Sequence, residues 1–182
     1  DAFIFFRYAE NVAKGHGPIW NVGEVPVEGF SSPLWLGLLA LGIFIGLSPM
    51  QASLGYGFVF VVGLLVVQWQ ISKRFVGAWF SFLSTALLAI IGSIYYWGFS
   101  GMETTLFALL FLCSVRALLD GKGWWLASLM ALARPEGPLL LLLWSAGFAW
   151  RFPKKISCVA LSAIPVVLYI GFRLYFYGEW LP

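Results

Sequence analysis

Long apolar runs separated by short polar segments make up the sequence from Pro33 onward. The hydrocarbon core of a bilayer is about 30 Å thick, and about 20 helical residues are needed to cross it. The run at 33–47 and both halves of the run at 124–150 are short for a span. The pattern predicts five to six hydrophobic helices, one of them broken at 134–138. The runs cover residues 33–47, 52–71, 76–97, 102–119, 124–150 and 156–177.

The first 33 residues differ from the rest because charged side chains are frequent among them. Apolar side chains recur at helical spacing through residues 1–14, opposite charged ones, which predicts an amphipathic helix. Gly15 and Gly17 end this helix, and residues 18–33 form a loop rich in turn residues. A short amphipathic helix beside hydrophobic spans is typical of the membrane–water interface. The apolar positions are Ala2, Phe5, Phe6, Ala9 and Val12, and the charged ones are Arg7, Glu10 and Lys14.

The composition indicates a membrane protein. Of the 182 residues, 61% are apolar and 10% are charged, and the mean hydropathy is +0.89, whereas about 25% of the residues in a soluble domain are charged. We therefore expect an all-α, polytopic transmembrane protein, with a front segment at residues 1–33 and a helical module at residues 34–182. Nucleic-acid binding is not indicated, because the basic residues occur singly or in twos and threes between apolar runs.

Three basic clusters predict which helix ends share a side of the membrane. They are separated by even numbers of apolar runs, so all three can lie on one face, which the positive-inside rule makes cytoplasmic. If residues 1–33 and the other polar segments share the outer face, that face holds seven of the eight acidic and four of the eleven basic residues, a net charge of −3, and the inner face has +6. The basic clusters are Lys73-Arg74, Arg116 with Lys122, and Arg151 with Lys154-Lys155. The outer segments are those around Glu103, Arg134–Glu136 and residues 177–182.

The stretch between residue 33 and Lys73 does not fit this topology. An odd number of crossings must join an outer residue 33 to an inner Lys73, yet the stretch contains two apolar runs. Either the run at 33–47 is a half-helix that does not cross, or one outer assignment is wrong. The sequence leaves both alternatives open.

Charged residues at the membrane edge mark candidate sites, because charge is costly there. Asp1 precedes the amphipathic helix and could act as a general base on a hydroxyl, or it could simply cap the helix. Glu103 stands at the start of a predicted helix, where a carboxylate suits the helix dipole. Arg134 stands beside the proline that breaks a helix. Its guanidinium could bind a phosphate bidentately, or it could pair with a glutamate and close the kink.

Short motifs occur in a particular order along the chain. The front segment contains Asp1-Ala2-Phe3-Ile4, Phe6-Arg7-Tyr8-Ala9, Gly15-His16-Gly17, Trp20-Asn21 and Val27-Glu28-Gly29-Phe30-Ser31-Ser32-Pro33. Later motifs are Gly101-Met102-Glu103-Thr104, Ala133-Arg134-Pro135-Glu136-Gly137 and Tyr177-Gly178-Glu179-Trp180-Leu181-Pro182. In order and spacing these motifs resemble the GT-C membrane glycosyltransferases, in particular the bacterial branch that includes the mycobacterial terminal arabinofuranosyltransferase. The resemblance covers nearly all of the chain.

This resemblance implies an inverting glycosyltransferase that moves a sugar from a polyprenyl-phosphate donor to a hydroxyl of a glycan, lipid or protein acceptor. It also implies a fold of GT-C type in a bacterial inner membrane, with residues 1–33 as the first extracytoplasmic loop and the active site facing outside. The family carries two adjacent aspartates, and Asp1 matches the second. We therefore expect the chain to be a fragment that lacks the first transmembrane helix and the C-terminal part.

The resemblance also implies roles for individual residues. A carboxylate of the aspartate pair is the expected catalytic base, which makes Asp1 the catalytic candidate. Arg134 is the first candidate for stabilising the lipid phosphate as it leaves, and Arg7 is the second. The outer acidic residues could also hold a divalent cation, although nothing in the sequence requires a cofactor. The residues expected to bind sugar hydroxyls or orient the arginines are Glu28, Glu103 and Glu136.

Two other functions stay open from the sequence. A lipid or solute transporter could use the broken helix at 134–138 as a site near the middle of the membrane, although the chain shows no internal repeat. A non-catalytic subunit of a membrane complex is the other alternative, and its outer acidic residues would tolerate substitution.

Overall fold

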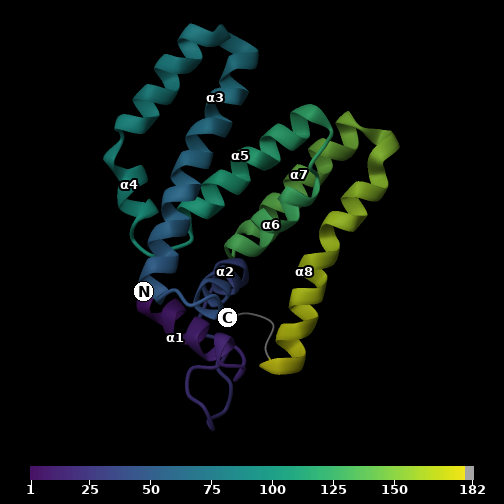
Figure 1. The fold of residues 1–182 in the computed structure, drawn as a ribbon. Coiled ribbons are helices and arrows are strands. Elements are labelled where there is room, and N and C mark those ends of the chain that lie inside the picture. The colour runs from purple at the N-terminus through teal and green to yellow at the C-terminus, as the bar shows by residue number, and fades with distance from the viewer. Residues whose placement is uncertain (179–182) are drawn as a thin grey trace.

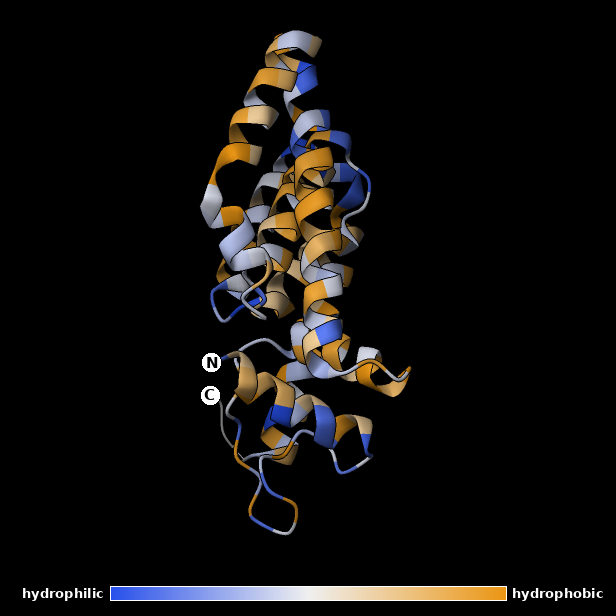
Figure 2. Ribbon diagram, turned by 60° about the vertical axis from the view of Figure 1, so that its left-hand side comes forward, coloured by the Kyte–Doolittle hydropathy of each residue, from blue (hydrophilic) through white to orange (hydrophobic). Residues whose placement is uncertain are grey.

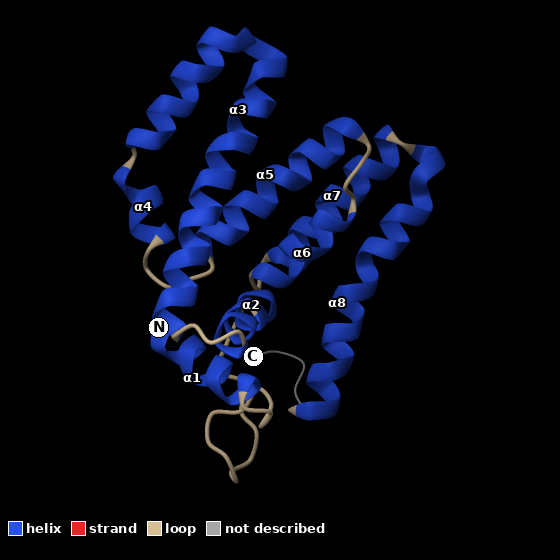
Figure 3. Ribbon diagram, viewed as in Figure 1, coloured by secondary structure: helices blue, strands red, loops and turns tan. Residues whose placement is uncertain are grey.

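The computed structural model describes residues 1–178, which form helices and loops without any strand (Figures 1 and 3). The predicted all-α class is thus confirmed, while the GT-C type stays a prediction. The helices are α1 (Ala2–Ala13), α2 (Pro33–Phe44), α3 (Pro49–Ile90), α4 (Gly92–Gly98), α5 (Thr104–Asp120), α6 (Trp125–Ala133), α7 (Gly137–Arg151), the 3-10 helix η1 (Pro153–Lys155) and α8 (Ile156–Phe176).

Serine and proline begin two of these helices. Ser32 accepts a hydrogen bond on its side chain from the backbone N–H of Trp35 at 3.2 Å, and the proline that follows it fits the first turn of α2. Ser48 and Gln51 form a reciprocal capping box at the start of α3. The apolar run predicted from residue 52 is therefore helical already from Pro49.

Helix α3 consists of two arms that fold back at Gly77 (Figure 1). Gly77 has φ 76° and ψ 176°, a conformation that glycine adopts without steric cost. The first arm, residues 49–76, is about 42 Å long at 1.5 Å per residue, which is enough to cross a bilayer. The second arm, residues 78–90, returns in the opposite direction and is continued by α4.

The predicted grouping of the three basic clusters at one end of the bundle is confirmed by direct contacts. Arg74 donates to the Asp120 carboxylate through Nη2 at 3.0 Å, and Arg116 Nε lies 3.4 Å from the same oxygen. Lys155 Nζ donates to the carbonyl of Gly121 at 2.7 Å. These bonds join α3, α5 and η1, so the basic end is a single region. Its position on the cytoplasmic face stays a prediction.

The short helix α2 lies at the opposite end, beside α1 (Figure 1). Its 12 residues are about 18 Å long, well short of the roughly 30 Å of a bilayer core. It packs against α1, α3 and α6. Of the two alternatives for residues 33–72, this arrangement favours a half-helix that does not cross.

Hydrophobic residues make up much of the helices (Figure 2), and many of their large side chains are exposed. Among residues 1–178, two segments are long and apolar enough to span a membrane, Pro49–Ile90 and Pro153–Phe176. Large side chains such as Ile90, Trp150 and Leu168 are exposed on these and neighbouring helices. A bilayer would cover this surface, so the structure supports the prediction of a membrane protein.

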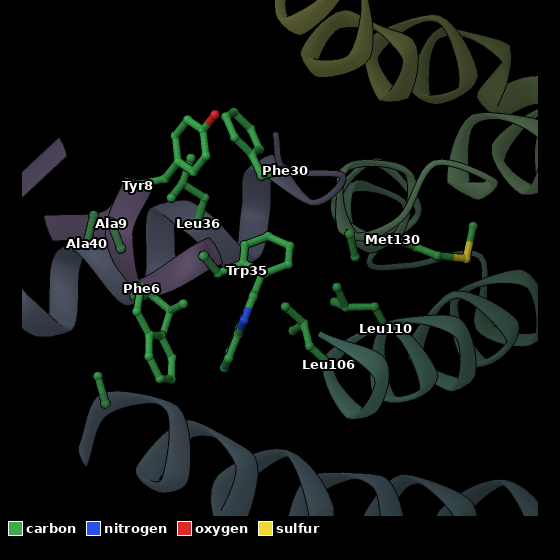
Figure 4. Packing of buried hydrophobic residues seen from close by; sticks show 14 residues of the cluster. Phe6, Tyr8, Ala9, Phe30, Trp35, Leu36, Ala40, Leu106, Leu110 and Met130 are labelled. Atoms are coloured by element: carbon green, nitrogen blue, oxygen red, sulfur yellow. The ribbon is translucent and has the colours of Figure 1, made fainter. Parts of the chain in front are cut away.

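The apolar side of α1 packs onto the helical module (Figure 4). Trp35 of α2 is at the centre of this contact, only 1% exposed, and its indole Nε1 donates to the carbonyl of Gly101 at 3.1 Å. Tyr8 and Phe30 meet edge to face, with ring centroids 5.2 Å apart. The front segment is therefore anchored on the bundle at the end where α5 begins. The buried members of this core include Phe5, Phe6, Tyr8, Ala9, Phe30, Leu39, Leu106, Leu110 and Met130.

Candidate functional site

A cavity of about 330 Å³ lies between the loop that follows α1, the break between α6 and α7, and α8. Its charged lining residues are Glu28, Arg134 and Arg173, and we call it the arginine cavity. Ligand sites typically have volumes of roughly 300–1,000 Å³ and combine apolar walls with a few polar groups. The arginine cavity has this character, because the rest of its lining is mostly apolar. Its apolar walls include Phe30, Leu132, Pro138, Val166 and Ile170.

Arg134 reaches the arginine cavity from the break between α6 and α7. Its backbone is extended, with φ −156° and ψ 157°, so α6 ends at this residue. Arg134 Nε lies 3.1 Å from Glu136 and 3.7 Å from Glu103, and the guanidinium lies 5.8 Å from the Phe107 ring centroid. The ion pairs expected if this arginine closes the kink are therefore present. Arg134 nevertheless remains about one-third exposed and lines the cavity.

Glu103 lies behind Arg134 rather than in the cavity. It precedes α5, but its side chain makes no capping hydrogen bond with that helix. The side chain is 4% exposed, and its Oε2 atom has no hydrogen-bond partner among the described residues. Burial raises the pKa of this carboxyl, and the charge of Arg134 partly offsets the effect. At this depth Glu103 orients Arg134 and does not reach a ligand in the cavity.

Glu28 is held in a buried cluster by two residues of α8. Arg173 Nε donates to one carboxylate oxygen at 2.7 Å, and the Tyr169 hydroxyl donates to the other at 2.6 Å. The side chains of Glu28 and Arg173 are 4% and 8% exposed. Buried charges of this kind are stable only when paired and hydrogen-bonded. The cluster thus fixes the end of the front loop against α8.

Further bonds hold the same loop in place. The Tyr8 hydroxyl donates to the carbonyl of Val27 at 2.7 Å, the residue next to Glu28. The Tyr177 hydroxyl donates to the carbonyl of Pro18 at 2.5 Å. Burial raises the pKa of both tyrosines, so both hydroxyls keep their protons and remain donors at neutral pH.

Asp1 lines a second cavity, of about 360 Å³, which we call the Asp1 cavity. Three residues, Glu28, Phe30 and Ser31, line both cavities and form a shared wall. Asp1 is exposed, and its side chain makes no capping hydrogen bond with α1. Asp1 and Arg134 thus line neighbouring cavities at the same end of the bundle.

Two predicted site residues lie apart from this wall. Arg7 is exposed on the other side of α1, where its Nε donates to the carbonyl of Trp20 at 3.2 Å, and it lines neither cavity. Glu136 is 48% exposed and touches the site only through Arg134. The structure therefore brings Asp1, Glu28 and Arg134 together, places Glu103 behind them, and does not bring Arg7 to them.

Arg173 and Tyr169 were not among the site residues predicted from the sequence. One signal could have found them, because Arg173 is the one charged residue within the last apolar run at 156–177. An ionisable residue inside such a run marks a functional candidate by default. Tyr169 stands one helical turn before it, so both side chains share a face of α8. Their partner Glu28, 141 and 145 positions away, could not be read from spacing.

No family model, curated protein or solved structure matches the chain. Among residues 1–178, no three His, Cys, Asp or Glu side chains are grouped so that they could hold a metal ion. The expected divalent cation therefore has no evident site there, and it stays a prediction. The function has to be inferred from the two cavities and the residues between them.

Proposed function

We propose that the chain forms the donor-binding part of an inverting glycosyltransferase, which moves a sugar from a polyprenyl-phosphate donor to an acceptor hydroxyl on the extracytoplasmic face of the membrane. The observation that carries the proposal is the arginine cavity. Its walls are apolar, its cationic groups are Arg134 and Arg173, and it lies at the end of the bundle opposite the basic clusters. An amphiphile with an anionic head fits these properties, because the head needs guanidinium groups and the tail needs an apolar surface.

The role of Arg134 is to stabilise the charge that develops on the phosphate as the sugar leaves. A guanidinium can bind two phosphate oxygens at once, and a donor fixed in advance in a poorly hydrated site stabilises the transition state most. Glu103 and Glu136 hold the side chain in place on two sides. Glu136 is half exposed, so solvent screens its charge and leaves the guanidinium more available to an anion.

The role of Asp1 is to take the proton from the acceptor hydroxyl. Inversion in a single displacement needs one general base and no covalent sugar–enzyme bond. The acceptor oxygen would form a bond to the anomeric carbon, the bond from that carbon to the phosphate oxygen would break, and the proton would pass to the carboxylate. The shared wall of the two cavities suits this scheme, since donor and acceptor would meet there.

Transfer of a radiolabelled sugar from polyprenyl phosphate tests the proposal. The purified protein in lipid vesicles is compared with its Asp1→Asn and Arg134→Gln variants. Each substitution is expected to lower the transfer rate by roughly a hundredfold or more, as is common for a general base or a preorganised charge stabiliser.

Glu10→Gln and Arg151→Gln serve as matched controls, because they make the same charge changes on residues that line neither cavity. Arg151 is exposed, and the Glu10 side chain is 38% exposed. Both substitutions are expected to leave the rate within about twofold, since exposed charges contribute little. Transfer that persists at the wild-type rate in both site variants would overturn the proposal.

A further inference from the structure

The Glu28 carboxylate lies in the wall that separates the two cavities. Glu28 lines both of them, yet its side chain is only 4% exposed because Arg173 and Tyr169 enclose it. Glu28 is the charged member of this wall, which it shares with Phe30 and Ser31.

Arg173 has two functions open to it in this arrangement. It is the counterion of Glu28, through Nε, and it also lines the arginine cavity that contains Arg134. A guanidinium presents its donors in a planar fork and can bind two acceptors at once. An anion in the arginine cavity would compete with Glu28 for the same cation. An alkyl phosphate, which is a monoester, carries up to two negative charges and three acceptor oxygens, so it competes well against a single carboxylate. A sugar-linked donor is a diester with one negative charge and competes less strongly.

The loop that carries Glu28 is bonded to the bundle at Val27 and Pro18, so the change of partner is a movement of the Glu28 side chain and its immediate backbone. The loop backbone runs without regular structure from Lys14 to Ser32, and Val25 and Val27 on it are exposed. On the far side of the wall lies the Asp1 cavity, which opens toward solvent and gives a displaced carboxylate a hydrated place. Tyr169 loses its acceptor in the same event and is then also available to an anion.

We propose that Arg173 is a second anion-binding residue of the arginine cavity, held in reserve by Glu28 until a phosphate headgroup displaces that carboxylate toward the Asp1 cavity. The inference rests on the proposed function for the identity of the headgroup, but its ligand chemistry is simply an alkyl phosphate. It gives the occupancy of one cavity a direct effect on the other. Binding of the phosphate would bring a second carboxylate beside Asp1.

Titration of octyl phosphate into the purified protein in nanodiscs of neutral lipid tests the inference, with binding followed by native mass spectrometry. Glu28→Gln keeps the shape of the side chain but removes the charge that competes for Arg173. It is expected to tighten octyl phosphate binding roughly tenfold. Arg173→Gln is expected to weaken the binding by a similar factor. Inorganic phosphate, titrated in parallel, separates a lipid headgroup from a free phosphate.

The direction in which Glu28→Gln changes octyl phosphate affinity distinguishes this anion exchange from a purely structural role of the Glu28–Arg173 ion pair. If the ion pair were purely structural, its loss would loosen the loop and weaken octyl phosphate binding. If Glu28 competes for Arg173, its loss strengthens that binding. Glu24→Gln is the matched control, because Glu24 is an exposed glutamate of the same loop. Binding by Glu28→Gln that is unchanged or weaker than in the wild type overturns the inference. The Glu28→Gln measurement tests the inference by itself even if Arg173→Gln does not fold.

The two proposals can fail separately. Sugar transfer by the wild type without the predicted order of octyl phosphate affinities leaves the glycosyltransferase proposal standing and rejects the role of Arg173. The predicted order without any sugar transfer supports the anion exchange and rejects the glycosyltransferase. Tighter binding of inorganic phosphate than of octyl phosphate would reject a lipid headgroup as the ligand and so overturn the inference as stated.

Discussion

Glu103 lies 3.7 Å from Arg134 Nε and connects the start of α5 to the break between α6 and α7. The two side chains differ in exposure: Glu103 is 4% exposed and Arg134 is 34% exposed. Glu136 lies closer to the same nitrogen, at 3.1 Å, but is 48% exposed. Solvent screens the nearer pair more strongly than the farther one. Glu103 is therefore the stronger determinant of where the guanidinium points.

Replacement of the two glutamates should separate their effects on donor use. Glu103→Gln is expected to raise the KM for the lipid-phosphate donor roughly tenfold, which corresponds to about 1.4 kcal/mol of lost binding free energy. Glu136→Gln is expected to change it by about twofold or less, because exposed ion pairs contribute about 0–1 kcal/mol. Steady-state kinetics of sugar transfer at several donor concentrations measures both.

A second measurement distinguishes a change at Arg134 from a general loss of folded protein. Octyl phosphate affinity should follow the same order as donor KM, since both depend on the position of Arg134. Equal effects of the two substitutions, or a larger one at Glu136, would show that distance outweighs burial at this site.

The raised pKa of Glu103 predicts a pH dependence of stability. A carboxyl group whose pKa is higher in the folded than in the unfolded protein stabilises the fold below its ordinary value of 4.5, and this contribution is lost as the pH rises through the raised value. Glutamine at this position cannot titrate. The melting temperature of the wild type relative to Glu103→Gln should therefore fall as the pH rises from about 4.5 toward neutral.

Melting curves of the two proteins in detergent, recorded at intervals of one pH unit, give this difference directly. Other titrating groups are common to both proteins and largely cancel. A difference that rises with pH would mean that the attraction of Arg134 outweighs burial, and that the pKa is lowered.

Much of the fold could be predicted from the sequence because apolar runs and their breakers act locally. Gly15 and Gly17 placed the end of α1 to within a few residues, and the proline at 135 placed the break between α6 and α7. The grouping of the basic clusters followed from counting runs. The fold-back at Gly77 was harder to place, because the polar break between the apolar runs lies at residues 72–75, whereas the helix continues through Lys73 and Arg74 and turns only at Gly77.

The candidate site was less predictable because its contacts join distant segments. Asp1, Glu28 and Arg134 were recognisable as charges in costly places, but spacing could not show that Arg7 points away from them. The pairing of Glu28 with Arg173 connects residues 145 positions apart. Local sequence carries no information about such a contact, so only the packed structure revealed it.

The crossing of α3 and α4 should be intolerant of even a small side chain. A Cβ atom on Gly57 would lie 1.8 Å from the carbonyl oxygen of Gly98, which belongs to rigid backbone. Gly57→Ala is therefore expected to lower the free energy of unfolding by about 1–3 kcal/mol. Gly55→Ala is the matched control, because a Cβ there meets nothing within 4 Å and Ala is the better helix former by about 1 kcal/mol. Thermal unfolding in detergent compares them, and equal stability of the two variants would contradict this packing.

The hydroxyl of Tyr8 should control the order of the front loop beside Glu28. It donates to the carbonyl of Val27 at 2.7 Å, while its ring packs on Phe30. Tyr8→Phe removes the hydrogen bond and keeps the ring, so it is expected to cost about 1 kcal/mol locally. Because the bond belongs to the loop and not to the helical bundle, the loss should appear as local opening rather than global unfolding.

Amide hydrogen exchange of residues 18–30 measures this opening. Exchange in Tyr8→Phe is expected to be about fivefold faster there, which is the effect of about 1 kcal/mol, with little change in α5 to α7. Tyr175→Phe is the control, since the Tyr175 side chain is 91% exposed and its loss should leave the loop unchanged. If both variants exchange at the wild-type rate, the Tyr8 hydroxyl does not hold the loop, and its order depends on the remaining contacts, which include the Glu28–Arg173–Tyr169 cluster and the bond from Tyr177 to Pro18.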